Sequence, residues 1–145
     1  MDPFIDIELS HRAAAGRIAV VMAVSMDGDD GMTALIRRLH PDDRKSVYIV
    51  AAPGCGETDG SLVRVHHLAS DELTVAQGCL CCGFRSELNA FLGQLFMSLL
   101  TRRERPVKVV FVLTKQDDHS VLEQSITHAS FLAQRYAFCG TLVLS

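Results

Sequence analysis

The stretch Arg17-Ile-Ala-Val-Val-Met-Ala-Val-Ser25 (RIAVVMAVS) decides the fold class of this chain. It is an unbroken apolar run of strand length, which is the pattern of a central parallel strand with helices on both faces. A glycine-bearing turn from Met26 to Gly31 follows it, and the segment from Thr33 to Leu39 then has apolar residues at helical spacing. A strand, a loop and a helix in this order form the first half of a β-α-β unit.

Two further apolar runs of strand length lie downstream, from Ser46 to Ala52 and from Val107 to Leu113. Between them, apolar residues recur at helical spacing from Leu88 to Leu100, and Thr141 to Ser145 predicts a last strand. Strands that alternate with helices predict one three-layer α/β domain over residues 16 to 145, with a mostly parallel sheet.

The other segments carry weaker patterns. Leu62 to Leu68 and Glu72 to Val75 alternate loosely, as short or edge strands do. Ser120 is followed three residues later by Glu123, which is the spacing of a capping box. We therefore predict a helix from Val121 to Tyr136, ended by Gly140.

Length and composition fit a single globular domain, with 145 residues, 48% hydrophobic and 21% charged. The net charge of -3 offers no electrostatic footprint for nucleic acid or an anionic membrane. Residues 1 to 15 lack the basic start and apolar core of a signal peptide, so we expect a lead-in or a short peripheral helix there. We expect a cytoplasmic protein with neither nucleic acid nor membrane as a partner.

Cysteine is the residue type that points most directly to chemistry. The chain has five, an odd and unevenly spaced set that argues against a secreted disulfide framework: Cys55, Cys79, Cys81, Cys82 and Cys139. Three of them stand within residues 79 to 82, between Gly78 and Gly83, and irregular backbone at these glycines would let neighbouring thiols face one ion. Thiolates favour Zn(II) or Cu(I), which take three or four ligands. The pattern predicts a soft-metal site at Cys79, Cys81 and Cys82.

Other interpretations of these residues stay open. The cluster could be a redox pair or an incidental reactive group, although Cys-Leu-Cys lacks the two-residue gap of a thioredoxin-type motif or a zinc knuckle. Cys55 lies in a loop after a predicted strand, where α/β folds place their sites, so it is the better candidate for an additional ligand. We interpret the adjacent His66 and His67 as surface strand residues. Cys139 is interpreted as a buried structural thiol at a helix end.

The segment Gly78-Cys-Leu-Cys-Cys82, with Arg85 and Leu88 after it, resembles the Gly-Cys-x-Cys-Cys signature of the CobW-like family. These proteins are P-loop GTPases concerned with metal delivery, related to UreG and HypB. The segment from Ser25 to Leu39 is similar in length and placement to the family's phosphate-binding loop and first helix. The resemblance covers Arg17 to Ser145 and implies a P-loop NTPase-like (Rossmann-like) fold without the family's C-terminal domain.

The phosphate loop departs from the family's pattern. A working loop needs glycines, a lysine and a Ser or Thr, but Met32 stands at the lysine position and Met26 at the first glycine. Asp27, Asp29 and Asp30 place acids where phosphate would lie, and each would oppose binding by about 4 kcal/mol at about 4 Å. The remaining candidate cofactor-binding residues are Gly28, Gly31 and Thr33. We therefore expect GTP and Mg(II) to bind poorly, and we predict no catalytic residue.

The leading hypothesis is a CobW-like pseudo-GTPase that binds a transition metal, with zinc as the expected ion, for metal homeostasis or for delivery to a recipient protein. One alternative is a GTP-binding metallochaperone GTPase that uses an altered loop. Another is a structural or interaction domain in which both sites have decayed. We also expect that an exposed sheet edge could be covered by a homodimer.

Overall fold

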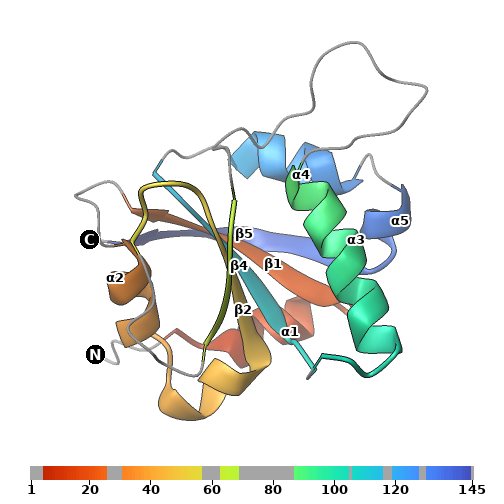
Figure 1. The fold of residues 1–145 in the computed structure, drawn as a ribbon, viewed down its shortest axis with the longest axis horizontal. Helices are drawn as coiled ribbons and strands as arrows, with labels where there is room; N and C mark the ends of the chain where they lie inside the picture. The colour runs from red at the N-terminus through yellow and green to blue at the C-terminus, as the bar shows by residue number, and fades with distance from the viewer. Residues whose placement is uncertain are drawn as a thin grey trace.

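A parallel sheet of five strands runs through the centre of the computed structural model, in the order β3-β2-β4-β1-β5 (Figure 1). The structure describes residues 5–25, 31–56, 63–68, 87–104, 106–115, 119–127 and 130–144. The strands are β1 (Ile18–Ser25), β2 (Val47–Ala51), β3 (Arg64–His67), β4 (Val109–Thr114) and β5 (Tyr136–Leu144). All four neighbouring pairs are parallel, which confirms the predicted α/β class.

Helices cover both faces of this sheet and complete three layers (Figure 1). One face carries α1 (Ile7–Ala13) and α2 (Gly31–Arg37), and a 3-10 turn, η1 (Pro41–Ser46), then leads into β2. The opposite face carries α3 (Glu87–Leu100), α4 (His119–Thr127) and α5 (Ser130–Ala133). In the part of the chain that the structure describes, no helix is long and apolar enough to cross a membrane.

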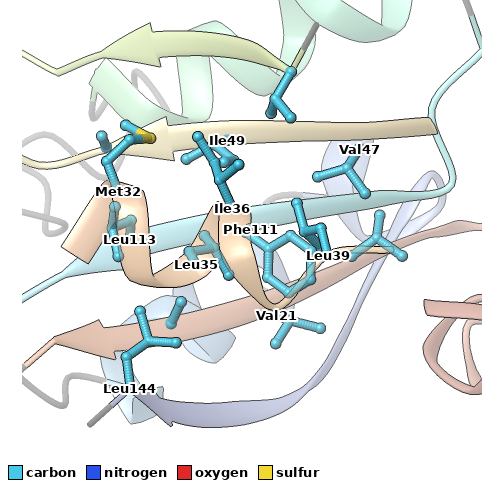
Figure 2. Close-up of a cluster of buried hydrophobic side chains, with 14 of the residues drawn as sticks. Val21, Met32, Leu35, Ile36, Leu39, Val47, Ile49, Phe111, Leu113 and Leu144 are labelled. Atoms are coloured by element: carbon cyan, nitrogen blue, oxygen red, sulfur yellow. The ribbon is translucent and has the colours of Figure 1, made fainter. Parts of the chain in front are cut away.

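Alternation along the strands divides the interior into two cores, because successive side chains of a strand point to opposite faces. The first core lies under α1 and α2 and includes Ala19, Val21, Ala23, Met32, Leu35, Leu39, Ile49, Phe111 and Leu113 (Figure 2). The second core lies under α3, α4 and α5 and includes Val20, Met22, Val24, Leu88, Leu92, Val110, Val112, Leu122 and Tyr136. The unbroken apolar run of β1 is thus explained by burial on both of its faces.

The N-terminal segment forms a short helix, which was one of its two predicted states. The Asp6 side chain accepts hydrogen bonds from the backbone N–H groups of Glu8 and Leu9, at 3.1 and 3.3 Å, and so caps α1. Strand β3 lies inside the predicted segment from Leu62 to Leu68, whereas the other weak strand, Glu72 to Val75, lies outside the described residues.

The predicted helix from Val121 to Tyr136 corresponds to two helices, α4 (His119–Thr127) and α5 (Ser130–Ala133), and it is wrong at its C-terminal end, where Tyr136 is a strand residue. Helix α4 already begins at His119, so Ser120 lies inside it, and Tyr136 begins β5 after the short α5. The Tyr136 hydroxyl donates to the Leu92 carbonyl oxygen of α3 at 2.7 Å, and the strand after it pairs with β1. These tertiary contacts outweigh the local helical pattern, because intrinsic propensity is a weak preference.

Gly140 therefore lies within β5 and does not end a helix, and Cys139 is a strand residue. Phe138 is paired with Val20 and Gly140 with Val21, so Cys139 is an extra residue in a bulge. Gly140 has a φ of 134°, which side-chain-bearing residues rarely adopt. The bulge shifts the alternation of β5 by one residue.

Candidate functional site

The strand order places a switch point between β1 and β4. These strands are neighbours and run parallel, yet β1 leads into α2 on one face and β4 leads into α4 on the other. Because the chain diverges there, the carboxyl ends of the two strands flank the position where open α/β sheets bind ligands. Ser25 and Thr114 are the last residues of these strands, and Lys115 follows directly.

Close packing characterises the start of α2 at this edge. A Cβ on Gly31 would lie 2.7 Å from the Cβ of Ser25, so no larger residue fits without movement of the chain. Gly31 is one of the candidate phosphate-binding residues, and here packing alone requires a glycine. Thr33 lies two residues further along α2 and is partly buried, whereas Gly28 lies outside the described residues.

Met32, at the position where the resemblance expects a lysine, is fully buried with 0% exposure. Its side chain belongs to the first core together with Leu113 and Ile49 (Figure 2). Its backbone N–H donates to the carbonyl oxygen of Cys55 at 2.8 Å, so that donor is already used within the protein. The start of α2 therefore presents neither a cationic side chain nor the Met32 amide to a phosphate.

Cys55, the additional metal ligand predicted from the sequence, is 1% exposed and lies in the loop after β2. Its thiol donates a long, weak hydrogen bond to the Leu113 carbonyl oxygen, with 3.8 Å between sulfur and oxygen. Burial raises the pKa of this thiol, and the charge of Lys115 opposes that shift in part. Cys55 is thus a protonated, packed thiol in this arrangement, and it would have to leave Leu113 to bind a metal.

Lys115 is the site residue that the sequence analysis missed. Its Nζ lies 3.1 Å from the position that a Cβ on Gly54 would take, so the side chain folds over the Cys55 loop. The signal available in the sequence was its place directly after a buried strand, whereas its closeness to the Cys55 loop follows from the pairing of β2 with β4. The two residues bring a thiol and a cation to one edge of the sheet.

Cys79, Cys81 and Cys82 lie outside the described residues, so their arrangement is not part of this geometry. The two ends of the chain that flank them are described. Leu68 follows β3 and donates its N–H to the Ala51 carbonyl oxygen at 2.8 Å, at the carboxyl end of β2. The last turn of α3 lies beside Ile18, at the amino end of β1. Because the helix runs back along the sheet, its first turn lies toward the carboxyl ends of the strands (Figure 1). Leu68 and the start of α3, the described residues that flank the cysteine segment, thus lie on the same side of the sheet as Cys55.

The two adjacent histidines lie on the edge strand β3, as predicted. The His66 ring stacks on Phe91 of α3, with 4.3 Å between ring centroids and 15° between ring planes, while His67 is exposed. Within the described ranges, no three His, Cys, Asp or Glu residues are grouped as a metal site would require. Neither histidine is therefore placed beside Cys55 in such a group.

Two surface grooves lie away from this edge and were not anticipated from the sequence. One, of about 590 Å³, runs between α3 and α5 and is lined by Asn89, Ala90, Gly93, Gln94, Met97, Ser98 and Phe131. The other, of about 640 Å³, lies at the amino ends of the strands, where Ile18 and Leu99 meet Arg102. Neither groove contains a cysteine, so neither adds a thiol to the candidate site.

Comparison with protein-family models, curated proteins and solved structures finds no match for this chain. The candidate site consequently rests on the chemistry of its own residues and on its place at the carboxyl edge of the sheet.

Proposed function

We propose that this chain binds a soft transition metal, with zinc as the expected ion, through Cys79, Cys81 and Cys82, and that it serves metal homeostasis or delivery. The observation that carries the proposal is the presence of three thiols within four residues, flanked by glycines. Thiolates are the ligands that Zn(II) and Cu(I) prefer, and three of them form most of a four-ligand site.

The fold supports this proposal through the described residues that flank the cysteine segment in the sequence. The described residues on both sides of it, Leu68 and Glu87, lie on the carboxyl side of a parallel sheet, where α/β proteins place ligand sites. Cys55 lies on the same side, within a loop that also approaches Lys115. A metal carried as cargo there would be within reach of a recipient protein docking on that edge.

Three thiolates and one divalent ion leave a net negative charge, so a nearby cation is expected to stabilise the loaded site. Arg85, three residues after Cys82, is the cation that the sequence places closest to the cluster. Because the ligands must lose their protons, metal binding should release protons and weaken as the pH falls.

The burial of Met32 supports the part of this proposal that concerns GTP, namely that the chain does not use GTP as CobW-like proteins do. A phosphate-binding lysine has to reach out of the loop, and Met32 instead fills the first core. Isothermal titration with GTP and Mg(II) should therefore detect no tight binding. Micromolar or tighter binding of GTP, or hydrolysis that Thr33→Ala abolishes, would favour an active GTPase over this proposal.

The central experiment is a zinc titration of the reduced chain against a chromophoric chelator. We expect one zinc ion to bind tightly, and the triple Cys79, Cys81 and Cys82→Ser variant to lose that binding. Cys139→Ser is the matched control, because Cys139 lies in β5 with its sulfur 3.5 Å from the Ser10 carbonyl oxygen. Cys55→Ser should weaken binding less than Cys81→Ser.

The titration is repeated with Cu(I), since the thiol set accepts either ion. Failure of the reduced chain to bind stoichiometric Zn(II) or Cu(I) would refute the proposal. So would a triple variant that binds as well as the unmodified chain, which would leave a redox or remnant role for the cluster.

A further inference from the structure

Strand β5 forms one edge of the sheet, and no other described strand pairs with its outer side. It is nine residues long, Tyr136–Leu144, which makes it the longest of the described strands. Among the described residues it pairs with β1 alone. The N–H and C=O groups on its other side are therefore a template for another strand, which natural proteins usually protect in some way.

The side chains of β5 provide none of the usual protection. The segment Tyr136 to Leu144 (YAFCGTLVL) contains no charged residue and no proline, and these are the residues that commonly keep edge strands apart. Toward its carboxyl end, Thr141 is exposed and Val143 is 54% exposed, so β-branched side chains face solvent. The other edge differs in its length and its charge.

Strand β3, at that other edge, is four residues long and carries Arg64, His66 and His67. The Arg64 guanidinium pairs with Glu104 at 2.7 Å and donates to the carbonyl oxygens of Lys45 and Pro106 at 2.7 and 3.3 Å. Short length and cationic side chains are devices that discourage edge pairing. Among the described residues, the β3 edge is thus short and charged, whereas the β5 edge is long and uncharged and is interrupted by the bulge at Cys139.

We propose that a second copy of this chain pairs with β5 through the arm Thr141 to Leu144. Two copies related by a two-fold axis bring identical strands together antiparallel, so that the N–H and C=O groups of each can face those of the other. Because the arm is uncharged, its self-pairing brings no like charges together, whereas a charged partner strand would find no opposite charge in it.

The bulge at Cys139 determines which part of β5 takes part. A bulge bends its strand and disrupts a straight ladder, so pairing is confined to one side of it. The arm before the bulge holds Tyr136, whose side chain is fully buried, while the arm after it holds the exposed Thr141 and Val143. A contact through one short arm buries little surface, so the dimer should be weak. We therefore expect it to be populated only at high protein concentration.

Sedimentation velocity over a wide range of protein concentrations tests this dimer. The unmodified chain is kept with a reductant and a metal chelator, which exclude disulfide-linked and metal-bridged dimers. We expect a monomer at low concentration and a dimer at high concentration. The variant Thr141→Lys with Val143→Lys should weaken dimerisation by roughly tenfold or more, because lysines on an edge oppose strand pairing.

The matched control is His67→Lys, which adds one exposed lysine to the β3 edge, as Val143→Lys alone adds one to β5, and which should leave dimerisation unchanged. Circular dichroism checks that the variants fold, as expected for exposed positions. In addition, a mixture of Val143→Lys with Val143→Glu should form more dimer than either variant alone, since opposite charges then meet. A monomer at all concentrations, or a dimer that the lysine variant leaves intact, would overturn the proposal. Both results are independent of zinc binding.

Discussion

The two faces of the sheet are built from the same strands but differ in what they bury. The first core, under α1 and α2, consists of aliphatic side chains with Phe111 and Cys55. The second core, under α3 to α5, includes the phenol of Tyr136, whose hydroxyl donates to the Leu92 carbonyl oxygen at 2.7 Å. The first face therefore depends mainly on apolar packing, with only the weak hydrogen bond of the Cys55 thiol described above, and the second also depends on the hydrogen-bonded hydroxyl of Tyr136.

Met32→Lys should have the largest effect, because it places an ammonium group in the apolar first core. Met32 is fully buried, and an unpaired charge at such a position costs far more than a lost methylene. We expect a loss of about 3 kcal/mol or more in the free energy of unfolding, measured by urea denaturation. Met32→Leu, the volume-conserving control, should cost less than about 1.5 kcal/mol.

This variant also tests the resemblance at the phosphate loop. If Met32→Lys remained as stable as the unmodified chain and gained GTP binding, the side chain would point out of the loop, and the first face would not depend mainly on apolar packing.

Tyr136→Phe tests the polar group of the second face. Removal of the hydroxyl leaves the Leu92 carbonyl without this donor, which should cost about 1 to 3 kcal/mol of unfolding free energy. Tyr48→Phe is the control, because the Tyr48 ring is only partly buried, and its effect should stay within about 0.5 kcal/mol. Equal effects of the two substitutions would mean that the hydrogen bond does not distinguish the second core.

The same tyrosine predicts a pH dependence. Burial raises the pKa of Tyr136 well above its usual value near 10, so the folded state favours the neutral phenol. The contribution of the neutral phenol to the free energy of unfolding is therefore complete below about pH 10, the pKa in the unfolded chain. It is lost as the pH rises from there toward the pKa in the folded state. Stability measured at alkaline pH should therefore decline less steeply in Tyr136→Phe than in the unmodified chain.

Gly140→Ala tests the bulge in β5, the strand that contributes to both cores. The φ of 134° disfavours any side chain, while no atom lies within 4 Å of the added Cβ, so the cost is backbone strain alone. We expect a loss of about 1 to 2 kcal/mol in thermal or urea unfolding. Gly93→Ala in α3, where the nearest atom is 3.8 Å away, should instead stabilise by about 0.5 to 1 kcal/mol.

Arg102→Gly should have the smallest effect, at the end of α3 on the second face. Arg102 has a φ of 59°, and the N–H groups of Arg102 and Arg103 donate to the Leu99 and Ser98 carbonyl oxygens at 3.2 and 2.9 Å. This is the Schellman pattern, in which glycine is preferred at the left-handed position. We expect a gain of about 0.5 to 1 kcal/mol by calorimetry, and a loss of stability would contradict this description of the helix end.

Local sequence patterns were sufficient to predict the strands that are buried on both faces of the sheet. The run from Arg17 to Ser25 predicted β1 to within a residue, and Ser46 to Ala52 and Val107 to Leu113 predicted β2 and β4 nearly as well. Burial on both faces leaves an unbroken apolar run that needs no knowledge of its neighbours. The cysteine cluster is likewise visible as a chemical pattern, although the residues that form it lie outside the described part.

Features that depend on contacts between distant residues were decided only by the tertiary structure. The helical pattern before Tyr136 ends early, because pairing with β1 and the hydrogen bond to Leu92 favour a strand there. The burial of Cys55 against Leu113 follows from β2 and β4 being neighbours, an order that no local pattern contains. By itself, the sequence determined the fold class and made the cluster of three thiols visible. Strand order and side-chain direction required the packed fold, because both arise from contacts between segments far apart in the chain.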